Sequence, residues 1–207
     1  MPENKGLSSG SKTKETIIKC ARELFSLYGY KGTSVRKLAA QVGVRESALY
    51  NHFKNKEDIF LAVSESIFSA HYPRSLESDI TEKAKGGKSF LSRFVTDYKL
   101  VTFDKHNESL FRILMLELLQ NRSLRKSFKE QYHDKNNKLL SQAFFIMMQD
   151  DLIKSSDPML LANEFMAPLF YLRLQVTLLR LDGESTNALA TQFEKHVEFF
   201  WDSIRNS

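Results

Sequence analysis

Residues 32–58, with the sequence GTSVRKLAAQVGVRESALYNHFKNKED, constrain the fold of this chain more than any other stretch. Apolar side chains recur at helical spacing in its first half, at Val35, Leu38, Ala39 and Val42. Gly43 supplies the positive φ that ends a helix in a sharp turn, and a second short helix is expected from about Arg45 to Phe53. A helix too short to be stable alone, with a polar outer side, is typical of the second helix of a helix-turn-helix. That helix would enter the major groove of DNA.

The side chains of this stretch divide into caps, inner residues and outer residues. Thr33 or Ser34 can accept a hydrogen bond from the free N–H groups that open the first helix. In the second helix, Leu49 and Phe53 lie one turn apart on the inner side. The opposite side carries Ser47, Asn51 and Lys54, with Tyr50 beside them. The outer side therefore offers hydrogen-bonding groups to a partner.

The net positive charge of the chain lies in the same region. The formal net charge is +5, from 30 Lys and Arg against 25 Asp and Glu. Residues 1–58 hold 11 of the basic and 6 of the acidic residues, whereas residues 59–207 hold 19 of each. The whole excess thus coincides with the helix-turn-helix pattern, which favours a phosphate-binding face over an ordinary solvated surface.

Composition and the positions of helix-breaking residues predict an all-α protein of about nine helices. The apolar content of 42% is ample for a core, while 8 Gly, 4 Pro and long periodic runs argue against a β-sandwich. We expect a disordered tail over 1–11, a helix-turn-helix domain over 12–58 and a helical body over 59–207. A fourth helix, opened by Asn55 and Lys56 and stopped near Pro73, would link the domain to the body.

Several classes of protein are disfavoured by what the sequence lacks. The single cysteine, Cys20, gives no disulfide or CxxC pattern, and the five histidines form no metal-binding pair. No nucleophile, P-loop or dinucleotide-binding motif is present, so we expect no enzyme activity, cofactor or metal. The N-terminus lacks an apolar signal-peptide stretch, and the apolar run 165–172 is too short to span a bilayer. A cytoplasmic protein without a membrane partner is expected.

The helix-turn-helix stretch resembles the DNA-binding head of the tetracycline-repressor family. The resemblance lies in the GTS opening, RKLA in the first helix, the following GV and the run LYNHFKNKED, and it covers roughly residues 12–60. It implies an N-terminal three-helix head, a divergent C-terminal effector domain and a homodimer built from the last two helices. It also implies a repressor that binds a palindromic double-stranded operator.

Nine residues of the head are candidate DNA contacts. Lys56 places a positive charge at a helix N-terminus, which is a good phosphate site, and the hydroxyls of Tyr50 and Thr33 can donate to phosphate. Arg36 stands where the family's tetracycline repressor has a base-reading arginine, for which a bidentate contact to guanine is plausible chemistry. The remaining positions that match the family's contacts are Ser47, Asn51 and His52.

Two neighbouring residues depart from the family pattern. Arg45 replaces the small capping residue that the family usually carries, so the recognition helix loses a side-chain cap and presents a long cation instead. Glu46 is a carboxylate facing a polyanion. It can accept from a cytosine amine, or it can pair with Arg45.

The body is rich in aromatic and methionine side chains, and it has two isolated charges on apolar helices. These side chains can fill an ordinary core, or some can line an apolar effector pocket between helices. Glu117 and Arg173 are either the polar groups of such a pocket or partners of each other, because an unpaired buried charge is costly. The candidate pocket comprises Phe94, Tyr98, Phe111, Met115, Glu117, Phe144, Met148, Met166, Phe170 and Arg173.

The last two helices are apolar enough to form the dimer interface that the resemblance implies. The candidate interface comprises Leu174, Leu178, Phe193, Val197, Phe200 and Trp201, with the last two as anchors. The function expected is a sequence-specific repressor released from DNA by a small apolar or amphipathic effector. The alternative is a DNA-binding regulator that a protein partner controls without a small molecule.

Overall fold

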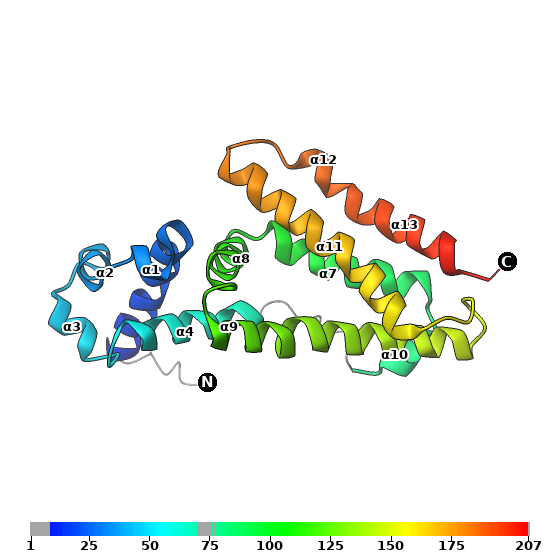
Figure 1. Ribbon diagram of the computed structural model, residues 1–207, viewed down its shortest axis with the longest axis horizontal. Coiled ribbons are helices and arrows are strands. Elements are labelled where there is room, and N and C mark those ends of the chain that lie inside the picture. Colours follow the sequence, from blue (N-terminus) through cyan, green and yellow to red (C-terminus); the bar gives the residue numbers. More distant parts are fainter. Residues whose placement is uncertain (1–8, 70–75, 77, 207) are drawn as a thin grey trace, which may run out of the picture. The chain divides into compact units, whose positions relative to one another are not determined.

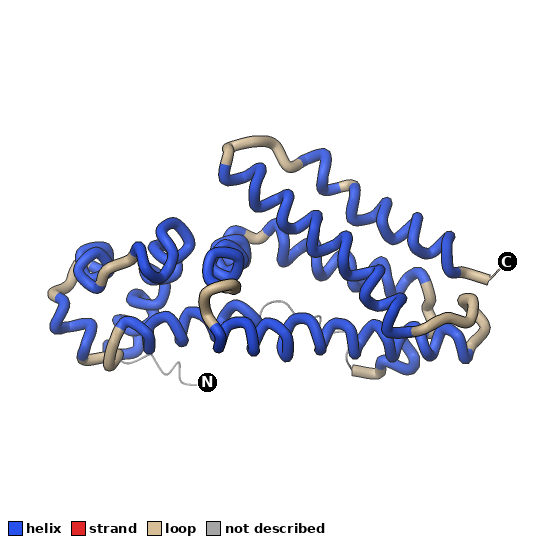
Figure 2. The backbone as a smooth tube through the Cα atoms, in the orientation of Figure 1, coloured by secondary structure: helices blue, strands red, loops and turns tan. Residues whose placement is uncertain are grey.

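The computed structural model describes residues 9–69, 76 and 78–206, and within these ranges the chain is helical (Figure 1). The all-α prediction is confirmed, since these residues form no strand beyond an isolated bridge between Ile153 and Arg205 (Figure 2). The helices are α1 (Ser9–Gly32), α2 (Val35–Val42), α3 (Glu46–Tyr50), α4 (Lys56–Ser69), α6 (Ile80–Ala84), α7 (Lys88–Phe103), α8 (Lys105–Glu117), α9 (Arg122–Ser127), η1 (Phe128–Asp134), α10 (Lys135–Gln149), α11 (Pro158–Leu181), α12 (Asn187–Ala190) and α13 (Gln192–Ile204). Their number is close to the prediction, and α9, the π-helix η1 and α10 follow one another without a break.

The described residues fall into two compact units. The first contains 9–69 and 109–125, and the second contains 76, 78–108 and 126–206. The boundary expected between residues 58 and 59 lies inside α4, all of which belongs to the first unit.

Two of the expected features lie partly or wholly outside the described residues. Most of the tail expected over 1–11 lies outside them, although α1 already includes residues 9–11. Pro73, expected to stop the fourth helix, also lies outside them, and the described part of α4 ends at Ser69.

In the first unit, an aromatic cluster joins α1 to α4. The Phe25 and Phe60 rings meet edge to face with centroids 5.5 Å apart, and the Tyr30 ring lies 5.0 Å from that of Phe60. Gly29 makes this possible, because its φ of 67° interrupts the helical path and turns Tyr30 back onto the cluster. Such aromatic pairs add to the stabilisation from buried apolar area, so the end of α1 is firmly placed.

In the second unit, α10 packs against α11 and α7 packs against α13. Four phenylalanines from four helices interlock at the centre, where Phe165 contacts the ring of Phe200 at 4.9 Å and that of Phe94 at 6.1 Å. Phe144 lies 5.8 Å from Phe200 and completes the cluster. Phe94, Phe144 and Phe165 are at most 1% exposed, so this part of the aromatic surplus fills a core. Within the described residues, no helix combines the length and apolar character needed to cross a membrane.

Candidate DNA-binding site

The helix α2 is fixed at both ends by local sequence. The hydroxyl of Ser34 accepts from the N–H of Lys37 over 3.1 Å, so Ser34 rather than Thr33 is the side-chain cap. At the other end, Gly43 has φ 80° and donates its N–H to the carbonyls of Ala39 and Ala40. The predicted helix and its glycine turn are therefore present as expected.

The helix α3 is shorter than the range 45–53 expected for it. Arg45 occupies its N-cap without a side-chain hydrogen bond, as the departure from the family pattern implied. The helix ends at Tyr50, and the residues shortly after it cap the start of α4. The side chain of Asn55 accepts from the N–H of Asp58, and that of Asp58 accepts from the N–H of Lys54. This reciprocal capping fixes the start of α4 directly after the recognition helix.

The inner and outer faces of the head are those that the sequence predicted. Leu38, Leu49 and Phe53 are buried, at 0%, 1% and 7% exposure. Six of the nine candidate DNA contacts are exposed on α2, α3 and their ends: Arg36, Arg45, Glu46, Ser47, Tyr50 and Asn51. Arg45 and Glu46, both among the described residues, form no ion pair with each other, and the Glu46 side chain is exposed.

Thr33 is placed differently from the expected phosphate contact. Its side chain is fully buried, and its hydroxyl donates to the carbonyl of Gly29 over 2.9 Å. The hydroxyl is used in closing the turn between α1 and α2, because the carbonyl of Gly29 has left the helical hydrogen-bonding pattern. Thr33 is a structural residue of that turn.

Lys56 also differs from expectation. Its ammonium group donates to the carbonyls of Tyr30, over 2.8 Å, and Thr33, over 3.0 Å, and it lies 4.1 Å from the centre of the Tyr30 ring. The side chain is half-buried. A lysine engaged in this way binds the α1–α2 turn to the start of α4 instead of reaching outward for a phosphate.

His52 is half-buried beside a shallow hollow at the end of the recognition helix. The hollow has a volume of about 340 Å³. The ammonium group of Lys14 lies over the Phe53 ring at its edge, 5.4 Å from the ring centre. The lining is formed by Lys14, His52, Phe53, Lys54, Asp58, Leu61, Ala62 and Glu65. His52 is therefore partly packed and partly accessible.

The candidate pocket residues are divided between the two units. Phe111, Met115 and Glu117 lie on α8 in the first unit, while the other seven lie in the second. The carboxylate of Glu117 accepts from the N–H of Tyr30 over 2.7 Å. Glu117 thus has a partner in the DNA-binding head, which the sequence did not reveal.

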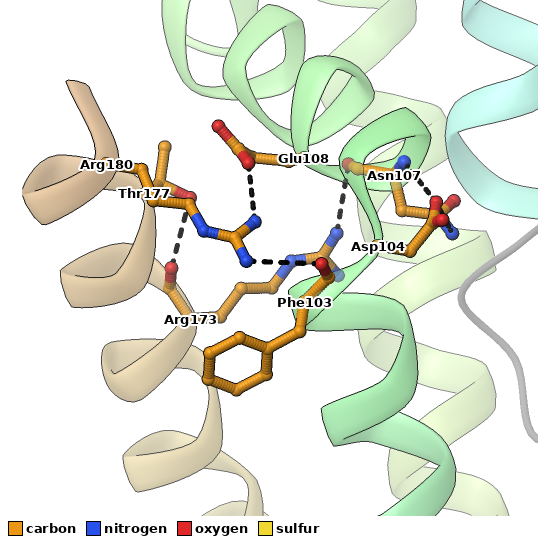
Figure 3. A network of polar contacts seen from close by, with 7 residues as sticks. All are labelled: Phe103, Asp104, Asn107, Glu108, Arg173, Thr177 and Arg180. Atoms are coloured by element: carbon orange, nitrogen blue, oxygen red, sulfur yellow. Dashed lines mark hydrogen bonds and ion pairs between the residues drawn. The ribbon is translucent and has the colours of Figure 1, made fainter. Parts of the chain in front are cut away.

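Arg173 lies in a polar network that fastens α11 to the junction of α7 and α8 (Figure 3). It is 1% exposed, and its guanidinium donates to the carbonyl of Asn107 over 3.4 Å. One α-helical turn further on, Thr177 donates to the carbonyl of Arg173 over 3.1 Å. Arg180 donates to the carbonyl of Phe103 over 3.2 Å in the same network. Arg173 therefore has partners inside its own unit, as a buried cation requires.

Two buried phenols lie beside Arg173. The hydroxyl oxygens of Tyr98 and Tyr132 are 2.5 Å apart, and the Arg173 guanidinium lies 6.0 Å from the centre of the Tyr98 ring. Burial raises the pKa of Tyr98 and raises that of Tyr132 well above 10, so both phenols are neutral at physiological pH. Tyr132 is absent from the pocket predicted by sequence, because it belongs to the π-helix η1, whose five-residue hydrogen bonding no α-helical pattern indicates.

A hollow of about 470 Å³ lies elsewhere in the second unit, between α6, α10 and the start of α11. Its lining combines apolar side chains with hydroxyl, amide and carboxylate groups and shares no residue with the predicted pocket. It is formed by Ile80, Thr81, Ser141, Gln142, Phe145, Ile146, Asp157, Pro158 and Met159.

The apolar stripe expected at the dimer interface faces the core of its own chain. Phe193, Val197 and Phe200 are 0%, 2% and 7% exposed, and Trp201 is half-buried with its ring against Gly87. Their spacing identified a buried face of α13 correctly, but that face packs on α7 and α11. These four residues are therefore intramolecular contacts, and the exposed aromatic residue of α13 is Phe199.

The outer side of α11 carries a stripe of residues, only two of which were predicted from the sequence as interface residues. Its residues follow a spacing of four and three and are exposed or half-exposed, as in the seam of a coiled coil. Of the expected interface residues, Leu174 and Leu178 lie on it. We define the α11 stripe as Leu160, Glu164, Ala167, Tyr171, Leu174, Leu178 and Leu181.

Comparison with known proteins identifies the family of the head. Residues 17–63 match the model of the bacterial regulatory proteins of the tetR family. The fatty acid metabolism regulator protein of Bacillus subtilis is 34% identical over 115 residues, which are 55% of this chain and 57% of that protein. The chain thus matches just over half the length of this relative.

Solved structures resemble the chain over nearly its whole length. A TetR transcription regulator from Haloarcula marismortui has a TM-score of 0.73 at 11% identity, covering 95% of this chain and all of that one. A protein from Saccharomonospora viridis, described as a transcriptional regulator and solved in complex with choline, has a TM-score of 0.71 at 18% identity, with 95% and 100% covered. At these identities the likeness concerns the fold. Residues 17–63 therefore carry the DNA-binding head of the tetracycline-repressor family.

Proposed function

We propose that the protein is a sequence-specific, DNA-binding transcriptional repressor. The observation that carries this proposal is the outer face of α2 and α3, where Arg36, Arg45, Ser47 and Asn51 are exposed above a buried inner face. Short polar side chains on a groove-entering helix suit contacts to base edges, and the net charge of +5 over residues 1–58 suits contacts to phosphate.

Roles within the face follow from side-chain chemistry. Arg36 has the planar donor pair that suits guanine, and Asn51 can pair with adenine. Tyr50 is 50% exposed, so its hydroxyl is available to a phosphate. Glu46 can accept from a cytosine amine, and His52 is accessible enough to contribute at the end of the helix. Arg45 supplies a cation to the groove or the backbone.

We propose further that the repressor is a homodimer that reads a palindrome. Two recognition helices about one DNA turn apart are needed to contact two half-sites. The apolar residues of the α11 stripe, together with Phe199 at 77% exposure, supply a surface for a second copy. Of the interface residues expected from sequence, Leu174 and Leu178 remain in this proposal.

The effector is proposed to be a small apolar or amphipathic molecule that binds the second unit and weakens DNA binding. The polar group for such a ligand is the cluster of Arg173, Tyr98 and Tyr132, set among aromatic rings. The remaining lining would come from Phe94, Phe144, Met148, Met166 and Phe170. Because the core rings are tightly buried, a ligand has to bind a form in which they separate, and it acts only through its differential affinity for that form. The choline complex of the Saccharomonospora protein supports a ligand site in this fold.

The experiment that tests the proposal is a binding selection from a random-sequence duplex library. The purified protein should enrich a palindromic sequence. A thermal-shift screen of hydrophobic cations, fatty acyl compounds and aromatic drugs then tests the effector, with release of the selected duplex as the second readout. Recovery of unselected sequence would contradict DNA recognition, whereas a selected duplex that no stabilising compound releases would contradict effector control.

A further inference from the structure

Tyr30 is held from both sides by charged side chains that come from different helices. Its N–H donates to the Glu117 carboxylate on α8 over 2.7 Å, and its carbonyl accepts from the Lys56 ammonium on α4 over 2.8 Å. Hydrogen bonds to charged groups are roughly twice as strong as neutral ones. The peptide groups on the two sides of one residue therefore connect α8 to the first residue of α4.

The turn is closely packed against Glu117 at Gly29. A Cβ at Gly29 would lie 3.0 Å from the Glu117 carboxylate oxygen, and φ at Gly29 is 67°. The Thr33 hydroxyl closes the turn on the carbonyl of Gly29, and the carbonyl of Thr33 also accepts from Lys56. Residues 29–33 are thus held by two side chains from other helices, those of Glu117 and Lys56, and by the hydroxyl of Thr33 itself.

The helix α2 begins directly after this turn, and the helix that follows α3 is bonded to it through Lys56. The helix α2, which presents Arg36, starts at Val35, two residues after Thr33. Lys56 opens α4, and the recognition helix α3 ends at Tyr50, six residues earlier. A shift of the turn therefore moves α2 and α3 relative to the rest of the head, even though Glu117 itself is 7% exposed and 87 residues away from Tyr30 in the sequence.

We propose that Glu117 is a positioning residue for DNA binding, which acts through Tyr30 and Lys56 on the placement of α2 and α3. The inference rests on the DNA-binding function proposed above. It gives Glu117 a role that differs from an effector-pocket group. The Glu117 carboxylate accepts from the Tyr30 N–H while the Lys56 ammonium donates to the Tyr30 carbonyl, so that the two charged side chains hold opposite sides of the same residue.

The direction in which Glu117→Gln changes DNA affinity distinguishes positioning from simple electrostatics. Glu117→Gln removes one negative charge from a protein that binds a polyanion, so electrostatics alone predicts tighter binding to any duplex. Loss of positioning predicts the opposite for a specific duplex, by roughly tenfold, because a charge-assisted hydrogen bond is replaced by a weaker one. Glu65→Gln is the matched control, since it makes the same charge change at an exposed position of α4.

The probes are a duplex that the wild-type protein selects from a random library and a random-sequence duplex of the same length. For Glu117→Gln we expect a roughly tenfold loss on the selected duplex and unchanged or tighter binding to the random one. Circular dichroism and melting curves confirm that the variant is folded at the assay temperature. Partial unfolding of the variant would lower the affinity for both duplexes in the same proportion. Loss of positioning would lower the affinity for the selected duplex alone.

A double-mutant cycle with Lys56→Met tests the route through Tyr30. If both side chains act on the same turn, the double variant should bind the selected duplex about as weakly as the weaker single variant, because coupled residues are non-additive. Multiplicative losses would overturn the route. Unchanged or tighter binding of Glu117→Gln to the selected duplex, or a parallel loss on both duplexes, would overturn the inference. A wild-type protein that does not distinguish the two duplexes would instead overturn the proposed function.

Discussion

Arg180 on α11 forms a 2.6 Å ion pair with Glu108 at the start of α8. The same guanidinium donates to the carbonyl of Phe103 and lies over the Phe103 ring, so one side chain caps the end of α7 and holds the start of α8 (Figure 3). The pair is largely shielded, with 25% and 11% of the two side chains exposed. It is therefore expected to matter more than an ion pair at the surface.

Replacement of Arg180 by Met should lower the free energy of unfolding by about 2 kcal/mol, because it leaves Glu108 and a helix-end carbonyl without the guanidinium. Arg93→Met is the matched control, since the Arg93–Asp97 pair is more exposed and should contribute under about 1 kcal/mol. Urea unfolding of both variants at one protein concentration measures the difference. Equal losses in the two variants would contradict the structural role of Arg180.

The position of Lys56 predicts an unusual salt dependence. A lysine that contacts phosphate contributes about one unit to the slope of log K against log salt concentration. Because the Lys56 ammonium is bound to two carbonyls, Lys56→Met should lower the affinity for the selected duplex while leaving that slope unchanged. Fluorescence anisotropy titrations between low and physiological salt measure it. A slope that falls by about one would restore Lys56 as a phosphate ligand.

Substitutions on the exposed stripe of α11 and on the buried face of α13 should have different effects. Leu178→Glu on the α11 stripe should convert a dimer to a folded monomer, since residue 178 is 51% exposed in the protomer and a carboxylate opposes association there. Phe200→Ala should instead destabilise the protomer by about 3–5 kcal/mol, because it opens a cavity in the core. Light scattering and melting curves separate the two effects. A wild-type monomer at micromolar concentration, or a Leu178→Glu dimer, would contradict the proposed interface.

His196 predicts a pH effect on stability. Its ring stacks on Phe165 and donates to the Phe165 carbonyl over 2.9 Å, and burial lowers its pKa from 6.5. Between 6.5 and the lower folded pKa, the unfolded chain binds more protons, so His196 makes stability fall as the pH falls through this range. His196→Gln keeps a donor without the titration and should show a smaller fall below about pH 6.5. Parallel stability profiles of the two proteins would contradict this assignment.

The head could be predicted closely because its signals are local. The Ser34 cap, the Gly43 turn and the Asn55 cap depend on residues a few positions apart, and periodicity indicated that Leu49 and Phe53 are buried. Where side chains of the head point was harder to predict. Lys56 and Thr33 were expected to face DNA because nothing in the sequence indicates that the turn after Gly29 folds back and offers its carbonyls.

In the body, the sequence did not indicate which distant residues contact each other. An isolated Glu117 on an apolar helix predicted a buried charge with a partner, but the partner is a backbone N–H 87 residues away. Periodicity found the buried stripe of Phe193, Val197 and Phe200. It could not distinguish a face that packs inside the protomer from one that meets a second copy, because both are apolar and follow the same helical spacing.

Sequence-specific recognition is measured by the ratio of affinities for the selected duplex and for a random-sequence duplex at physiological salt. We expect a ratio of at least about 10³, as direct readout by the α2 and α3 side chains requires. Equal affinities, with both falling steeply as salt rises, would show a basic protein that binds phosphate without reading sequence, and would contradict a sequence-specific repressor.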